Sequence, residues 1–189
     1  MSAGVAGVLL AAGAGRRFGM PKALVRHRGR LFVETAAEVL REAGCDPVIV
    51  VLGASAEHAR VSAELPGTTV IDNPDWASGM GSSLRVGLAA LPDDVLAAVI
   101  LPVDTPGVTA AAVRRVAEHA APGALARATY DGQPGHPVLI GRDHWAAVSA
   151  SATGDQGARE YLRTHSVTEV PCADIAEGLD VDTPADLTE

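Results

Sequence analysis

Residues 8–24 read VLLAAGAGRRFGMPKAL, an apolar run that breaks into a glycine-rich loop carrying two arginines and a lysine. The apolar run favours a buried first strand, because it is too short to span a membrane. A loop that follows such a strand presents free backbone N–H groups beside fixed cations, and together these can hold a polyphosphate. A side chain at Gly13 or Gly15 would keep the backbone away from that ligand. The stretch therefore predicts a phosphate-binding loop at the end of the first strand.

The spacing within this loop excludes two better-known phosphate-binding motifs. The dinucleotide fingerprint G-x-G-x-x-G requires a glycine where this chain has Phe18. A P-loop requires Gly-Lys followed by Ser or Thr, whereas Lys22 lies between Pro21 and Ala23. Lys22 is the only lysine of the chain, which indicates a position that needs a compact ammonium rather than a planar guanidinium. The alternative is a plain glycine-rich connection whose arginines are solvated.

Length and charge limit the class of partner. The 189 residues fit one domain, 1–189, which is long enough to bury a core. The formal net charge of −8 disfavours a nucleic-acid partner, because binding a phosphate backbone needs a broad basic surface. The positive charge is instead local, and this suits a small anionic ligand. It comes from neighbouring side chains of one short stretch, namely Arg16, Arg17, Lys22, Arg26, Arg28 and Arg30.

Cysteine usage and hydropathy indicate a compartment. Cys45 and Cys172 are isolated, so neither a disulfide scaffold nor a zinc site is expected. The apolar N-terminus lacks the basic segment that precedes the apolar core of a signal peptide, and no run is long enough to cross a bilayer. We expect a cytoplasmic protein without a membrane partner. No pattern in the sequence indicates an oligomeric state.

Apolar runs and helical patterns alternate along most of the chain, which favours a parallel sheet with right-handed crossovers. After the first strand, strands are expected at 47–52, 67–71 and 97–101, and helices at 32–43, 55–64, 82–91 and 109–120. In the last third, 125–130 and 135–140 read as a hairpin, a short helix ends near 164, and 167–170 reads as an edge strand. The prediction is an α/β fold whose mostly parallel central sheet carries a small antiparallel extension.

A second place favourable to anions lies at residues 79–83, where a turn-rich loop becomes a helix. Gly81, Ser82 and Ser83 fall at the expected helix N-terminus, whose backbone N–H groups favour negative charge. Ser82 is equally well explained as the N-cap of this helix. Ser55 is expected to cap the helix at 55–64, and Thr109 the helix at 109–120.

Two aspartates are candidate ligands of a divalent cation. Asp104 follows the strand at 97–101, and open α/β sheets bind their ligands at the carboxyl ends of their strands. Mg²⁺ takes one or two protein carboxylates and completes its octahedron with phosphate and water oxygens. Asp104 is the first candidate and Asp182 the second, whereas Asp186 is expected to face solvent. The alternative makes Asp104 and Asp182 helix caps, since both precede Thr-Pro.

The chain resembles the MobA-like nucleotidyltransferases, and within them the molybdenum cofactor cytidylyltransferases. The resemblance covers nearly the whole chain and is carried by six ordered motifs: LLAAGAGRRFGMPKAL, NPDWASGMGSSLRVGL, LPVDTP, GHPVLI, GDQGAR and DVDTPADL. It implies a three-layer, Rossmann-like nucleotidyltransferase fold. The guanylyl-transferring branch typically has Gly-Gly and an Asp before the lysine, whereas this chain has Ala12-Gly13 and Pro21-Lys22. CTP is therefore the expected nucleotide, with GTP as the alternative.

The resemblance also implies roles for residues and a reaction. Backbone groups of Leu10, Ala11, Ala12 and Gly13 would contact the base and ribose. The triphosphate would be held by Gly15, Arg16, Arg17 and Lys22, and the magnesium by Asp104. The terminal phosphate of molybdopterin would attack the α-phosphorus of CTP and release pyrophosphate. Such catalysis is mostly positioning and charge neutralisation, so the catalytic residues would be Arg17, Lys22 and Asp104.

The acceptor side is less defined by sequence, and a sugar phosphate or another phosphorylated metabolite remains an alternative to molybdopterin. His136 and Asp155 lie in matched motifs and are candidates for contact with the acceptor; a structural brace and a helix cap are their respective alternatives. Trp76 is either a core or rim residue or a platform for the pterin. Two rival functions remain open. Relatives of the family are NAD(P)H-dependent nicotine blue oxidoreductases, and a non-catalytic chaperone would have a molybdoenzyme as its partner.

Overall fold

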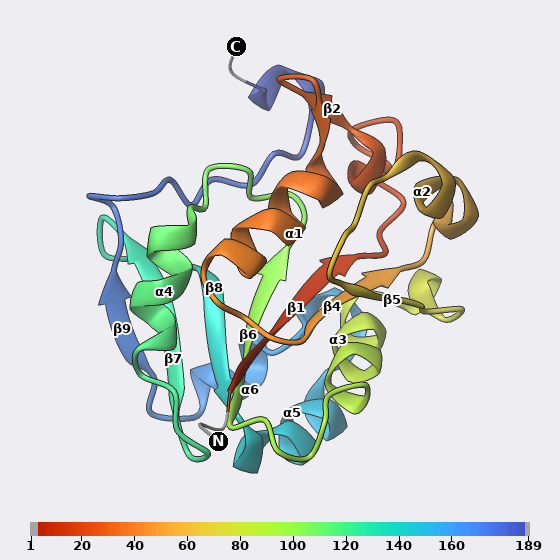
Figure 1. The fold of residues 1–189 in the computed structure, drawn as a ribbon. Coiled ribbons are helices and arrows are strands. Elements are labelled where there is room, and N and C mark those ends of the chain that lie inside the picture. Colours follow the sequence, from red (N-terminus) through yellow and green to blue (C-terminus); the bar gives the residue numbers. More distant parts are fainter. Residues whose placement is uncertain (1–3, 188–189) are drawn as a thin grey trace.

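The central element is a seven-stranded sheet with strand order β5-β4-β1-β6-β8-β7-β9 (Figure 1). The structure is a computed structural model that describes residues 4–187. Residues 1–3 and 188–189, which belong to the predicted domain 1–189, lie outside the described residues. The strands are β1 Val5–Ala11, β4 Val48–Leu52, β5 Thr69–Asp72, β6 Ala97–Pro102, β7 Leu125–Tyr130, β8 Gln133–Gly141 and β9 Thr168–Pro171.

One strand breaks the parallel order of this sheet. β5, β4, β1 and β6 pair in parallel, β8 runs antiparallel between β6 and β7, and β9 is parallel to β7. Asp131 and Gly132 have positive φ and form the tight turn that joins β7 to β8. A separate antiparallel pair consists of β2 Arg26–His27 and β3 Arg30–Leu31. The predicted mostly parallel sheet with a small antiparallel extension is confirmed.

Helices cover both faces of the sheet and give three layers (Figure 1). The first face carries α1 Phe32–Glu42, α2 Ala56–Ser62 and α4 Ala110–Ala117; the second carries α3 Met80–Ala89, α5 Trp145–Ser151 and α6 Arg159–Arg163. Short 3₁₀ turns lie at η1 Lys22–Leu24, η2 Trp76–Ser78, η3 Arg142–His144, η4 Gly154–Gln156 and η5 Pro184–Asp186. Among the described residues, no helix combines the length and apolarity needed to span a membrane.

The central strands are apolar throughout because both of their faces are buried. Along β1, Leu9 and Ala11 pack into the core on the first face, whereas Val8 and Leu10 pack into the core on the second. Successive side chains of β1 therefore pack against helices on opposite faces of the sheet. Cys45 and Cys172 are both free thiols and both are buried.

Several predicted boundaries and caps need correction. α3 begins at Met80 with Gly79 as its N-cap, so Ser82 lies inside the first turn and the N-cap interpretation of Ser82 is wrong. Ser55 does occupy the N-cap position of α2, but it adopts a left-handed conformation and its side chain makes no capping hydrogen bond. Thr109 caps α4 as predicted, since its Oγ1 accepts from the Ala112 N–H at 3.2 Å.

Candidate active site

The glycine-rich loop leaves the carboxyl end of β1 and folds back tightly on itself. Gly15 has φ +62°, and a Cβ at this position would lie 1.9 Å from the Met20 carbonyl oxygen. The Gly19 N–H donates to the Gly15 carbonyl at 2.8 Å and closes the turn. A Cβ at Gly13 would meet nothing within 4 Å, so this backbone faces open space. Gly15 is therefore required by the turn itself, and Gly13 leaves room beside it.

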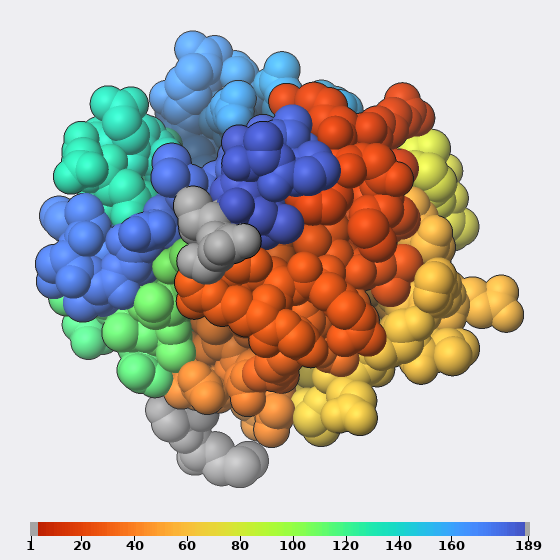
Figure 2. Space-filling model, turned by 90° about the horizontal axis from the view of Figure 1, so that it is seen from above, coloured from red at the N-terminus to blue at the C-terminus, as the bar shows by residue number. Residues whose placement is uncertain are grey.

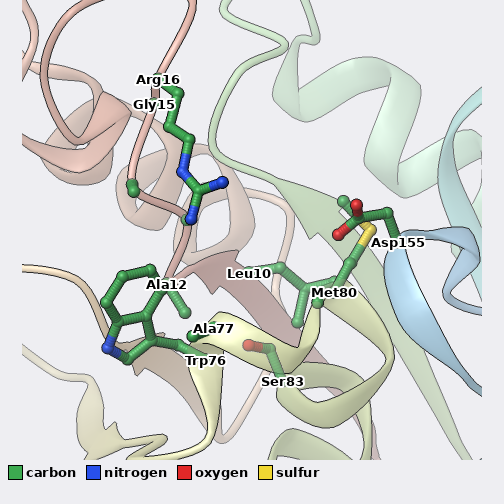
Figure 3. Close-up of a pocket in the computed structure, with 12 residues that line it drawn as sticks. Leu10, Ala12, Gly15, Arg16, Trp76, Ala77, Met80, Ser83 and Asp155 are labelled. Atoms are coloured by element: carbon green, nitrogen blue, oxygen red, sulfur yellow. The ribbon is translucent and has the colours of Figure 1, made fainter.

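The loop forms one wall of a first hollow of about 290 Å³ (Figure 3). Leu10 and Ala12 form its floor, and Trp76 lies on one side. The Arg16 side chain extends over this floor, and Met80 and Asp155 lie opposite Trp76. Trp76 thus belongs to the hollow beside the glycine loop rather than to the acceptor side.

The four residues expected to contact a base and ribose are not equivalent. Leu10, Ala12 and Gly13 line the hollow, whereas the side chain of Ala11 is buried in the core of the opposite face. The carbonyls of Leu10 and Ala12 already accept from Val103 N at 3.0 Å and Ala54 N at 2.9 Å. Any contact of Ala11 with a ligand would thus involve its backbone alone.

A buried amide holds the start of α3 in place. Asn73 is 1% exposed, and its Nδ2 donates to Ser82 Oγ at 2.8 Å and to Ser83 Oγ at 2.9 Å. Ser82 Oγ also donates to the Gly79 carbonyl at 2.8 Å, and Ser82 does not line the hollow. Gly81 packs against the backbone of residues 152–153. Ser83 is the member of the predicted trio that lines the hollow.

Lys22 joins the loop to two aspartates. Its Nζ donates to Asp104 Oδ2 at 3.0 Å and to Asp182 Oδ1 at 2.9 Å. The lysine and Asp104 side chains are only 15% and 21% exposed, whereas Arg17, 3.4 Å from Asp182 Oδ1, is 76% exposed. Burial opposes the charge of Lys22, but the bonds and charges of Asp182 and Asp104 outweigh it, so the pKa of Lys22 is raised. The ammonium stays charged at neutral pH.

The backbone of the C-terminal segment places Asp182 next to Asp104. The Val181 N–H donates to the Asp104 carbonyl at 2.8 Å, and the Val181 side chain is buried, so the residues on either side of it project away from the core. Asp186 is exposed and accepts from the backbone N–H groups of Asp182 and Thr183. The carboxylates of Asp104 and Asp182 bond to Lys22, and within residues 4–187 neither caps a helix.

The donor set fits a hard cation that brings ligands of its own. No three His, Cys, Asp or Glu side chains form a metal-binding group within residues 4–187. Two carboxylates converging on one point are nevertheless what Mg²⁺ takes from a protein when phosphate and water supply the rest. Lys22 supplies the positive charge between those carboxylates in this structure. Asp104 and Asp182 could therefore hold a divalent cation once the ammonium moves toward a phosphate.

A second hollow of about 280 Å³ lies beyond Asp104 and meets the first at Leu10, Met80 and Asp155. Figure 2 looks onto this edge of the molecule, where the loop (red), the β7–β8 hairpin (teal) and the C-terminal segment (dark blue) meet. The floor of the second hollow is apolar, and its polar lining consists of Asp104, Arg127, His136, Asp155, Gln156, Arg159 and Asp180. The predicted acceptor residues His136 and Asp155 both line it, and Asp155 marks its junction with the first hollow.

The surroundings shift the pKa of two titratable side chains in the second hollow, those of His136 and Asp180. Burial lowers the pKa of His136, which favours a neutral imidazole even though Asp104 acts in the opposite direction. Partial burial, together with the charges of Asp104 and Asp182, raises the pKa of Asp180. Negative charge is thus concentrated where the second hollow reaches Asp104.

The ring of Tyr130 ties the acceptor side to the C-terminal segment. A Cβ at Gly135 or at Gly178 would lie less than 3 Å from this ring, so both glycines are needed for the close approach. The Tyr130 hydroxyl donates to the His136 carbonyl at 2.6 Å, and burial raises the pKa of Tyr130 to about 12. The tyrosine acts here as a neutral donor and packing group.

Several residues of the crevice carry no predicted role. The sequence predicts no nucleotide contact for Trp76 and no role in the site for Met80, Arg127, Arg159 or Asp180. The GDQGAR motif contains Arg159 and is the available signal for it. Arg127 carries no motif signal, because its position depends on β7 lying next to β8 and β9.

The parallel strands, the glycine loop at the end of β1, and Asp104 after β6 with Asp182 beside it define an α/β protein with a crevice at the carboxyl ends of its strands. Residues 7–170 match the MobA-like NTP transferase domain. The chain belongs to this family of nucleotidyltransferase enzymes, which confirms the resemblance seen in the sequence.

Some relatives match nearly the whole chain, and others match only part of it. A nicotine blue oxidoreductase from Paenarthrobacter nicotinovorans is 41% identical over 191 residues, covering 95% of this chain and 92% of the relative. A probable molybdenum cofactor guanylyltransferase from Bacillus cytotoxicus is 31% identical over 114 residues, 59% of this chain and 55% of the relative. Rv0371c from Mycobacterium tuberculosis has a TM-score of 0.83 at 30% identity, covering 98% of this chain and 96% of that chain. The same protein has been solved in complex with manganese, with a TM-score of 0.76 at 29% identity and coverage of 98% and 94%.

Proposed function

We propose that the protein transfers CMP from CTP to a phosphorylated acceptor, molybdopterin, and releases pyrophosphate in a magnesium-dependent reaction. The proposal treats 1–189 as a single transferase domain. The observation that carries it is one continuous crevice. The glycine loop and Arg16 line its first part, the Lys22–Asp104–Asp182 cluster lies in the middle, and a second hollow follows beyond Asp104.

The residues of the crevice suit the charge changes of such a transfer. An oxygen of the acceptor phosphate forms a bond to the α-phosphorus of CTP, and the bond from that phosphorus to the bridging oxygen breaks, so pyrophosphate leaves with the electron pair. Arg16, Arg17 and Lys22 are cations that would neutralise the triphosphate and the departing pyrophosphate. Leu10, Ala12, Gly13 and Ser83 would fix the base and ribose, and Ala11 would contribute through its backbone.

Asp104 and Asp182 would hold the divalent cation. Bound there, Mg²⁺ would neutralise phosphate charge and orient the reacting groups. The manganese complex of the mycobacterial relative supports a divalent cation in this fold. His136 and Asp155 would contact the acceptor, and Gly81 and Ser82 would support the start of α3 rather than touch the nucleotide.

Pyrophosphate release tests this proposal. We expect release when CTP, molybdopterin and MgCl₂ are all present, and loss of at least about 90% of it when EDTA replaces the metal. GTP should support a lower rate, since Ala12-Gly13 and Pro21-Lys22 are typical of the cytidylyl branch. If GTP is the better donor, the choice of CTP is wrong; if no nucleotide supports release, the transferase proposal itself is wrong.

A second candidate function is an NAD(P)H-dependent reduction of the nicotine blue type. It is favoured by the relative named nicotine blue oxidoreductase, which is 41% identical and is matched over 92% of its own length. The same Arg16 and Arg17 could hold the phosphates of NADPH. Metal-independent oxidation of NADPH in the presence of nicotine blue, without pyrophosphate release from CTP, would establish this function in place of the transferase.

A further inference from the structure

The second hollow continues past the acceptor residues into an outer hollow. The outer hollow is lined by Arg127, Pro134, Arg159, Leu162, Arg163, His165 and Val167. It shares four residues with the second hollow but not Asp104, Lys22 or any part of the glycine loop. The order along the crevice is therefore glycine loop, Asp104, apolar floor and outer hollow.

The apolar stretch between the two charged ends is built from the sheet, α3 and α6. Its side chains are Leu84, Ile100, Val138, Ile140 and Leu162, all of which are buried. Such a surface suits the flat or apolar middle of a small molecule. It offers no group that could neutralise charge, so charge recognition must occur at the ends.

The outer hollow concentrates positive charge on a protein whose net charge is −8. The Arg127 side chain is 23% exposed, and its Nη2 donates to Glu169 Oε1 at 3.1 Å. Its Nε is buried and has no acceptor within residues 4–187. Glu169 therefore leaves part of this guanidinium without a partner within residues 4–187. A buried donor that lacks an acceptor costs free energy, so the ion pair with Glu169 does not fully satisfy Arg127.

Arg159 adds a second cation to this end of the crevice. It lies where the second and outer hollows join, and within residues 4–187 it forms no ion pair. By contrast, Arg163 is paired with Glu160, and the His165 ring stacks on Tyr161 with centroids 3.8 Å apart. Arg159 and the part of Arg127 that Glu169 does not satisfy are thus the groups available to an incoming anion.

We propose that the outer hollow binds an oxyanion, such as a carboxylate or phosphate, through Arg127 and Arg159. This anion is distinct from the reacting phosphate of the acceptor, which would lie near Asp104, and only the position given for that reacting phosphate rests on the proposed function. The oxyanion site itself rests only on the outer hollow.

NMR of arginine side chains tests the site directly with inorganic phosphate as the probe. We expect the Nε–Hε signals of Arg127 and Arg159 to shift saturably with phosphate in the presence of excess CTP and MgCl₂, which occupy the glycine loop. Arg114, on the opposite face and bonded to the Glu42 carbonyl at 2.8 Å, is the internal control and should not move. Signals of Arg127 and Arg159 that stay fixed would overturn the site. Signals that instead drift linearly with phosphate, together with that of Arg114, would also overturn it and would indicate an adventitious ion only.

Two matched variants separate anion binding from a structural ion pair. Arg127→Gln should weaken phosphate binding by about tenfold, as loss of a charge-assisted bond predicts. Glu169→Gln removes the competing carboxylate and should strengthen phosphate binding. If the pair is merely structural, the two variants will change binding and thermal stability in the same direction. Arg159→Gln, which breaks no ion pair, keeps the test valid if Arg127→Gln fails to fold.

Kinetics with CTP separate this site from the glycine loop. Arg159→Gln should leave the KM for CTP unchanged, because the outer hollow contains no part of the glycine loop and no Lys22. A KM for CTP that rises about tenfold in Arg159→Gln would show that this arginine serves the nucleotide and would overturn the separate oxyanion site. If CTP fails to shift the Arg16 and Arg17 signals, the proposed function is contradicted. The oxyanion site does not depend on that result, because it is tested by the phosphate shifts of Arg127 and Arg159.

Discussion

At the scale of single residues, the central feature is an ammonium shared by two carboxylates. Lys22 is the only lysine of the chain and lies between Asp104 and Asp182 at hydrogen-bonding distance from both. A compact ammonium can bond to two carboxylates and later to a phosphate, whereas a guanidinium is a planar fork of fixed geometry. A divalent cation held by Asp104 and Asp182, as proposed, would therefore compete with the lysine for the same pair of carboxylates.

Lys22→Met should separate these two roles. We expect kcat/KM for CTP to fall by about 100-fold or more, because the substitution removes the cation that would neutralise the phosphates. In the absence of nucleotide, Mn²⁺ should bind more tightly than to the wild type, since no ammonium neutralises the carboxylates. Titration followed by the Mn²⁺ EPR signal measures this, with Arg26→Met, an exposed cation outside the crevice, as control. Weaker Mn²⁺ binding in Lys22→Met would contradict the shared position.

Asp104→Asn tests the metal role of the strand-end carboxylate. We expect turnover to fall by at least about 100-fold, with little of it recovered by raising MgCl₂. Asp174→Asn is the control, since Asp174 pairs with Arg115 on the surface. If Asp104→Asn instead keeps its activity and loses only about 1 kcal/mol of unfolding free energy, the aspartate is no more than a local stabilising group.

At the scale of elements, one carboxylate joins the start of α1 to the segment after α2. Glu34 Oε2 accepts from Leu31 N and Oε1 accepts from Glu64 N, both at 2.9 Å. Burial opposes its charge, but the two backbone bonds outweigh burial and lower the pKa of Glu34 below 4.5. The pKa of Glu34 is therefore lower in the folded state than in the unfolded chain. The resulting stabilisation is complete at pH values above the unfolded-state pKa and is lost as the pH falls through the folded-state pKa.

Glu34→Gln should therefore show a pH-dependent loss of stability. At pH 7 we expect a loss of about 1 kcal/mol in unfolding free energy, because a neutral amide accepts backbone bonds less strongly than a carboxylate. The difference from the wild type should shrink as the pH drops below 4.5. Urea unfolding at a series of pH values measures this, with Glu57→Gln, which replaces an exposed carboxylate, as control. A difference that stays constant with pH would contradict the account.

The contact between α3 and β1 depends on a glycine inside the helix. A Cβ at Gly87 would lie 2.5 Å from Val8 Cγ1. Gly87→Ala should therefore destabilise the fold by about 1–3 kcal/mol through overpacking, although alanine in an ordinary helix interior would stabilise it by about 0.5–1 kcal/mol. Urea unfolding measures whether Gly87→Ala lowers or raises the free energy of unfolding. Val8→Ala combined with Gly87→Ala should recover part of the loss, and absence of recovery would place the cause elsewhere.

At the scale of the whole molecule, the sequence predicts the part of the crevice that depends on local order. The strands ending at Ala11 and Pro102 are apolar on both faces, and their order implies parallel neighbours, so Lys22 and Asp104 could be expected at one sheet edge. Arg127 could not be expected there. Its place depends on β8 inserting antiparallel between β6 and β7, and strand order of this kind leaves no periodic signal in the sequence.

The start of α3 shows the other limit of sequence reasoning. A Gly-Ser-Ser turn before an apolar helical pattern predicts an anion site, but Asn73, which precedes Ser82 by nine residues and lies across the intervening turn, donates hydrogen bonds to both serine hydroxyls. A buried amide of this kind is recognised only once tertiary contacts are known. The sequence therefore identified the loop, the lysine and the aspartates better than it identified the groups that position them.

Equilibrium binding of CTP tests the central claim most directly, because the claim concerns where the triphosphate and its cation lie. Isothermal titration should show CTP binding with MgCl₂, at least about tenfold weaker binding with EDTA, and a similar loss in Lys22→Met. Titration of NADPH under the same conditions should give weaker binding that does not depend on metal. Tight, metal-independent binding of NADPH together with no detectable binding of CTP would contradict the nucleotidyltransferase account.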